Sequence, residues 1–98
     1  MPEQNEALRV HVWVMGQVQG VGFRAHVENS ARQIGVMGWV RNVGWDTVEA
    51  VAEGERARID RFIETMKKGP PGSHVDESRV EWETPTREFG EFGVKRSL

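Results

Sequence analysis

The 98-residue sequence contains no cysteine. This absence excludes disulfide bonds within the chain, thiolate nucleophiles and cysteine metal sites, and it fits a reducing compartment, with the cytoplasm as the default expectation. No apolar run approaches the roughly 20 residues of a membrane span, and the opening MPEQNEA lacks the basic and apolar regions of a signal peptide. We therefore expect no membrane association, a flexible tail over residues 1–7 and a single domain over residues 8–98.

An excess of positive charge is also missing. Thirteen Lys and Arg residues against fifteen Asp and Glu give a formal net charge of -2, whereas nucleic-acid-binding domains usually carry a basic excess. The histidines His11, His26 and His74 are scattered and do not have the spacing of metal ligands. No Lys-Ser or Lys-Thr pair completes the phosphate loop of nucleotide hydrolases, and no serine lies in the pattern of a catalytic triad. We expect no nucleic-acid partner, no metal and no nucleotide triphosphate chemistry.

The sequence does contain apolar residues that recur with the periods of strands and helices. Alternation from Leu8 to Met15 predicts a half-buried strand, and spacings of three or four from Phe23 to Ile34 predict a helix that Gly35 ends. A second apolar stripe predicts a helix that ends at Lys68, where GPPG stops it. The remaining pattern predicts strands over residues 36–43 and 47–53, a loop over residues 69–75, and strands around residues 80–82 and 92–94.

This order of elements selects a fold class. Only Gly44, Trp45 and Asp46 separate the second and third predicted strands, so these strands should form a hairpin. Antiparallel neighbours exclude a doubly wound parallel sheet. The sequence predicts an α+β fold, a ferredoxin-like split βαβ sandwich. Its antiparallel sheet, βαββαβ plus a short C-terminal strand, should be covered on one face by two helices.

The stretch GQVQGVGFR, residues 16–24, connects the first strand to the first helix. A split βαβ unit brings this stretch to the same sheet edge as Asn42, with the two strand ends about 10 Å apart. Backbone N–H groups at a helix N-terminus favour an anion, Gly20 and Gly22 permit the turn, and the Arg24 guanidinium suits two phosphate oxygens. On these residues alone, an ordinary glycine-rich turn with a solvated Arg24 remains an equal alternative.

Two longer motifs add a family resemblance. GQVQGVGFR at 16–24 resembles the phosphate-binding signature of the acylphosphatases, and GWVRN at 38–42 followed by TVEAVAEG at 47–54 resembles their second signature. The resemblance continues through GPPGSHVDESRVEWE at 69–83 and covers residues 8–96. It implies the ferredoxin-like fold and hydrolysis of small acyl phosphates to a carboxylate and inorganic phosphate, without metal or cofactor. GVGFRA also fits the loose dinucleotide pattern G-x-G-x-x-G/A, but the hairpin topology and short chain do not supply that fold.

The resemblance also implies roles for individual residues. The Arg24 guanidinium and the loop amides should hold the phosphate, and Asn42 should orient the attacking water. The amides are those of Gln19, Gly20, Val21, Gly22, Phe23 and Arg24. One departure lies in the turn after Asn42, where Asp46 stands at a position that is usually glycine in the family, so the turn should be re-formed at Gly44. We expect the neighbouring Trp45 to lie at the hairpin tip rather than to cover the site.

Two other functions are compatible with parts of the sequence. A noncatalytic module of the same fold that binds phosphate or a phosphoprotein would explain the glycine stretch, but it gives Asn42 no special role. RNA binding on the open sheet face would use Trp13 and Trp39, but the aromatic RNP1 pattern is missing and the charge balance is acidic. The single small domain favours a monomer.

Overall fold

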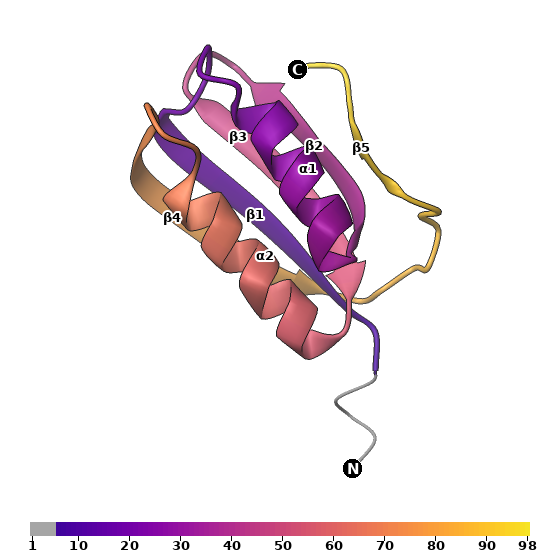
Figure 1. Ribbon diagram of the computed structural model, residues 1–98. Coiled ribbons are helices and arrows are strands. Elements are labelled where there is room, and N and C mark those ends of the chain that lie inside the picture. Colours follow the sequence, from indigo (N-terminus) through magenta and orange to yellow (C-terminus); the bar gives the residue numbers. More distant parts are fainter. Residues whose placement is uncertain (1–5) are drawn as a thin grey trace.

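A computed structural model describes residues 6–98 (Figure 1). The sheet has the strand order β4-β1-β3-β2-β5, and both helices lie on one of its faces. Most of the tail expected at residues 1–7 falls on residues 1–5, which lie outside the described residues. The elements are β1 Leu8–Gln17, α1 Phe23–Ile34, β2 Met37–Val43, β3 Thr47–Gly54, α2 Arg56–Lys68, β4 His74–Glu83 and β5 Phe92–Val94.

The predicted ferredoxin-like α+β fold is confirmed. Strand β3 lies between β1 and β2 and runs antiparallel to both, so β1 and β2 are parallel and end at the same sheet edge. One detail was wrong: β5 pairs parallel with β2, so the five-stranded sheet is mixed rather than antiparallel throughout. Strand β4, at one edge of the sheet, runs antiparallel to β2. After β4 the chain passes to the other edge and reverses its direction, so β5 runs parallel to β2.

The core lies between the helices and one face of the sheet. Six sheet residues on this face are fully buried: Val10, Val12, Val14, Val40, Val48 and Ala50. Helix α1 ends at Gly35, whose N–H donates to Ala31 O at 2.8 Å, as the sequence predicted. The loop expected at residues 69–75 is shorter, because β4 already begins at His74 and pairs with β1 as far as Gln17. Packing in this core holds the N-terminus of α1 against the sheet face near the C-terminal end of β2.

The opposite face of the sheet carries a network of charged and aromatic side chains. His11 Nε2 lies 2.6 Å from Glu49 Oε2, and His11 Nδ1 lies 2.8 Å from Glu83 Oε2. Burial raises the pKa of Glu49, but hydrogen bonds from Arg41 and His11 outweigh burial and hold this pKa below its usual value. The His11 ring also stacks on Trp13, with centroids 3.8 Å apart. This face is therefore occupied by its own internal contacts.

Candidate active site

A glycine loop, residues 18–22, leads from β1 into α1. Gly20 has a φ of 77° and Gly22 a φ of 75°, and a Cβ placed on either residue would meet nothing within 4 Å. Glycine is therefore favoured at these two positions because of their positive φ, and not because a side chain would clash with neighbouring atoms. Gly22 is the N-cap of α1 and provides no side-chain cap. Within residues 6–98, no group accepts a hydrogen bond from the N–H groups of residues 19–22, so these donors remain available to a ligand.

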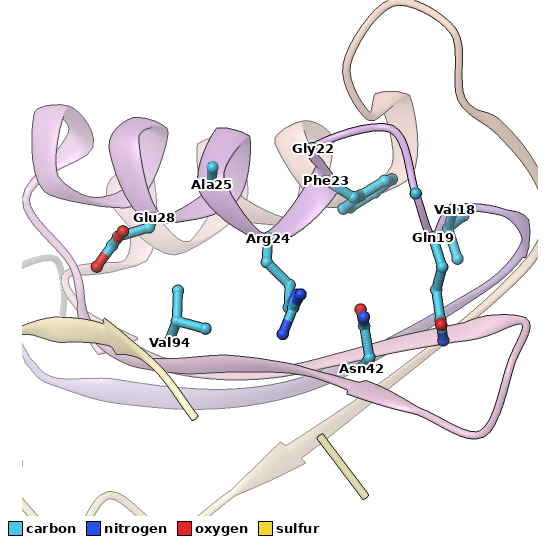
Figure 2. A pocket seen from close by; sticks show the side chains of 10 residues that line it. Val18, Gln19, Gly22, Phe23, Arg24, Ala25, Glu28, Asn42 and Val94 are labelled. Atoms are coloured by element: carbon cyan, nitrogen blue, oxygen red, sulfur yellow. The ribbon is translucent and has the colours of Figure 1, made fainter. Parts of the chain in front are cut away.

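Arg24 lies in the first turn of α1 and points from the helix toward the sheet (Figure 2). Its Nη1 donates to Ser97 Oγ at 3.4 Å. No carboxylate of residues 6–98 lies within 4.0 Å of the guanidinium, although most other arginines of this part of the chain have such a partner. The positive charge of Arg24 is therefore not neutralised by a neighbouring side chain, and it adds to the positive end of the α1 dipole.

The side chain of Gln19 fastens the glycine loop to the turn between β2 and β3. Its Nε2 donates to Thr47 O at 2.9 Å and to Gly44 O at 3.2 Å. These bonds direct the Gln19 side chain toward the turn, as Figure 2 shows. They use only the side-chain amide, so the backbone N–H of Gln19 stays among the free donors of the glycine loop. Sequence reasoning placed Gln19 in the loop but missed this contact, which joins the two halves of the site.

Asn42 lies near the end of β2, and its side chain points into the same space as the Arg24 side chain (Figure 2). The turn that follows is formed with Gly44 in the left-handed region at a φ of 62°, as predicted, so Asp46 needs no unusual backbone conformation. Trp45 is 83% exposed at the hairpin tip and does not line the space around Asn42. The departure in this turn therefore leaves Asn42 at the edge predicted for it.

These groups enclose a cavity of about 340 Å³, here called the site cavity. This volume lies at the lower end of the range found for small-molecule pockets. Arg24 is the only cation and Glu28 the only carboxylate among its described lining residues. The lining residues are Val18, Gln19, Gly20, Gly22, Phe23, Arg24, Ala25, Glu28, Asn42 and Val94.

The arrangement suits a small oxyanion. The glycine loop with its unpaired N–H groups, the N-terminus of α1 and the uncompensated Arg24 guanidinium border the site cavity, and the uncharged Asn42 amide lines it from β2. Neither serine nor cysteine lines the cavity, so the described lining offers no hydroxyl or thiol nucleophile. Residues 6–98 also contain no cluster of three or more metal-ligating side chains. The groups that the described lining does offer include one guanidinium, one carboxylate and the Asn42 amide, which can position and stabilise a charged ligand.

Comparison with protein families decides the assignment. The family model described as Acylphosphatase matches residues 10–94. The chain belongs to the acylphosphatase family. An acylphosphatase of Anaeromyxobacter sp. (strain Fw109-5) is 44% identical over 90 residues, which are 92% of this chain and 97% of that relative.

Solved structures of acylphosphatases have the same architecture. The structure of an acylphosphatase from Coxiella burnetii superimposes with a TM-score of 0.87 at 36% identity, covering 95% of this chain and 96% of that one. The acylphosphatase from Bacillus subtilis superimposes with a TM-score of 0.85 at 34% identity, covering 90% of this chain and 98% of that one. The likeness extends over nearly the whole of each chain, so the fold and the family assignment agree.

The site cavity brings together most of the residues predicted from the acylphosphatase signatures. Arg24 and Asn42 both line it, as do Gln19, Gly20, Gly22 and Phe23. Val21 does not: its side chain packs against the core. Sequence reasoning missed Glu28 and Val94. The four-residue spacing from Arg24 to Glu28 could have placed Glu28 on the same helix face, whereas Val94 depended on knowing where β5 lies.

Proposed function

We propose that the site cavity is where this chain performs the activity of its family, the hydrolysis of acyl phosphates. The substrate is a small-molecule acyl phosphate, and inorganic phosphate is a product. In the proposed site, the phosphoryl group lies against the backbone N–H groups of residues 19–24. The Arg24 guanidinium contacts two of its oxygens, and Asn42 holds the attacking water. The free loop donors and the uncompensated charge of Arg24 support this placement.

The proposed reaction is an attack of water on phosphorus. The bond from phosphorus to the acyl oxygen breaks, the carboxylate leaves with the electron pair, and water supplies the hydroxyl of the new phosphate. A carboxylate is a good leaving group and needs no acid. The proton of the attacking water passes to a phosphate oxygen, so no side-chain base is required. Loop donors and Arg24 stabilise the charge on the equatorial oxygens, as phosphoryl transfer demands.

The observation that carries this proposal is the position of Asn42. A module that only binds phosphate needs the glycine loop and Arg24, and it gains nothing from an amide facing them. In the described structure Asn42 lines the same cavity as both. An amide both donates and accepts hydrogen bonds, so it can orient a water molecule without adding a charge. No observation favours the noncatalytic alternative.

Phosphate titration combined with turnover separates these two functions. We expect Asn42→Ala to bind inorganic phosphate within about threefold of the wild-type Kd, because only the water contact is removed, and to lose about 100-fold or more in kcat. Binding is measured by calorimetry and turnover by phosphate release from benzoyl phosphate. Phosphate binding by a wild-type protein that shows no turnover would support the noncatalytic module instead.

We further propose that the protein acts as a monomer without a nucleic-acid partner. The single small domain supports a monomer. The two indoles that RNA bases would stack on already have partners. Arg41 and Lys95 lie over Trp39 at 4.8 and 4.4 Å from the ring centroid, and the His11 ring stacks on Trp13. Within the described residues, no helix is long and apolar enough to cross a membrane. A cytoplasmic location stays a prediction.

A further inference from the structure

The last residues of the chain run alongside both halves of the site. This C-terminal segment, residues 95–98, continues beyond β5 along the edge of β2, and Figure 1 shows it ending near the glycine loop and the β2–β3 turn. Lys95 N–H donates to Val40 O at 2.9 Å, and Leu98 N–H donates to Asn42 O at 2.9 Å. The backbone N–H of Gly44 in turn donates to Leu98 O at 3.0 Å. The segment is therefore held in register with Asn42.

This register places the Ser97 hydroxyl beside the guanidinium of Arg24. Arg24 Nη1 donates to Ser97 Oγ at 3.4 Å, and this is the only hydrogen bond of the Arg24 side chain among residues 6–98. Ser97 lies 73 residues away in sequence, so the contact exists only because the C-terminal segment pairs with β2. The partner is a neutral group, unlike the carboxylates that pair with Arg9 and Arg41.

We propose that Ser97 is a positioning residue for the acyl phosphate reaction: its uncharged hydroxyl holds the Arg24 guanidinium toward the site cavity without neutralising its charge. This inference rests on the proposed phosphate-binding role of Arg24. An arginine side chain has many rotamers, and holding it in one conformation before the substrate arrives reduces the ordering cost of binding. The hydrogen bond from Leu98 N–H to Asn42 O holds the same segment against β2, next to Asn42.

The neutrality of the partner is the distinguishing feature. A carboxylate beside Arg24 would hold the guanidinium at least as firmly, because charge-assisted hydrogen bonds are stronger than neutral ones. It would also compete with the substrate phosphate for the same donors and cancel the field in the cavity. A structural contact at this position would tolerate a carboxylate, whereas a contact that serves anion binding would not.

Ser97→Asp and Ser97→Asn test this difference, since the two side chains have nearly the same shape and differ in charge. Benzoyl phosphate hydrolysis gives kcat and KM, and competitive inhibition by inorganic phosphate gives Ki. We expect Ser97→Ala to lower kcat/KM about 3- to 10-fold and to raise Ki similarly, the size of one lost neutral hydrogen bond. Ser97→Thr should restore most of this loss. Ser97→Asp should lower kcat/KM about 30-fold or more, and Ser97→Asn much less.

Three controls make the result interpretable. Ser78→Asp adds the same charge on the exposed opposite sheet edge and should change kcat/KM less than twofold. Leu98→Pro removes the N–H that bonds to Asn42 O, and Leu98→Ala keeps it, so only the proline variant should lose activity. Equal kinetics of Ser97→Asp and Ser97→Asn, or wild-type kinetics of Ser97→Ala, would overturn the inference. If Arg24→Ala also kept wild-type phosphate inhibition, the proposed function itself would fail.

Discussion

Replacing Arg24 separates the contribution of its charge from that of its two-pronged geometry. The guanidinium lines the site cavity, and no carboxylate of the described residues lies within 4.0 Å of it. Its full charge is therefore free for the substrate. Two charge-assisted hydrogen bonds to a phosphoryl group contribute about 3–5 kcal/mol in total. Removing both in Arg24→Ala should lower kcat/KM about 10²- to 10⁴-fold, since each 1.36 kcal/mol corresponds to about tenfold in rate.

Lysine at the same position keeps the charge but offers a single ammonium group in place of a planar fork. We expect Arg24→Lys to recover about half of the lost free energy, which places kcat/KM about 10- to 100-fold below wild type. The assay is phosphate release from benzoyl phosphate at several substrate concentrations. Arg61→Ala, which removes an exposed cation of α2, is the matched control and should leave the kinetics unchanged. An Arg24→Ala protein within tenfold of wild type would refute the reasoning.

Three further predictions address the loop, the sheet network and substrate choice. Gly22→Ala places a Cβ on a residue with a φ of 75°, so the free energy of unfolding should fall by about 1 kcal/mol. In a thermal melt, Tm should fall by about 4–8 °C. The control Gly90→Ala changes a glycine without a positive φ and should change neither quantity. The pKa of Glu49 is held below its ordinary value of about 4.5, so its stabilising effect is complete above that pH and is lost as pH falls through the lower folded-state pKa. Urea melts below pH 4.5 should therefore show a steeper loss of stability for wild type than for Glu49→Gln, and parallel curves would contradict this. Glu28 is the one carboxylate among the described cavity-lining residues, so Glu28→Gln should raise kcat/KM for an anionic acyl phosphate such as succinyl phosphate relative to benzoyl phosphate by about threefold, and an unchanged ratio would exclude an effect of its charge.

The fold was predictable because local patterns and topology agreed. The apolar periods placed the strands and helices, and the short turn at Gly44 fixed the antiparallel hairpin. The direction of β5 was not predictable, because a strand of three residues carries little pattern and the connection before it can return to the sheet either way. The start of β4 was misjudged because the stop at GPPG ends a helix but does not say how soon pairing resumes.

The site was predictable to the extent that it follows from the same topology. Two parallel strands ending at one edge bring the glycine loop and Asn42 together. Contacts that depend on long-range register could not be read from sequence: the Gln19 side chain reaches the β2–β3 turn, and Ser97 reaches Arg24 only through the pairing of the C-terminal segment. For Val21, the side chain is partly buried and packs against the core, whereas the role predicted for this residue concerns its backbone N–H and stays a prediction.

The most direct test of metal-independent acyl phosphate hydrolysis in the site cavity is one rate measurement. Purified wild-type protein is incubated with benzoyl phosphate in excess chelator, and the release of inorganic phosphate is followed against a protein-free control. We predict multiple turnovers at the same rate with and without chelator, because the described lining of the cavity supplies the charge and the water-orienting amide from its own residues. Loss of turnover in chelator, or no turnover in either condition, would contradict the account.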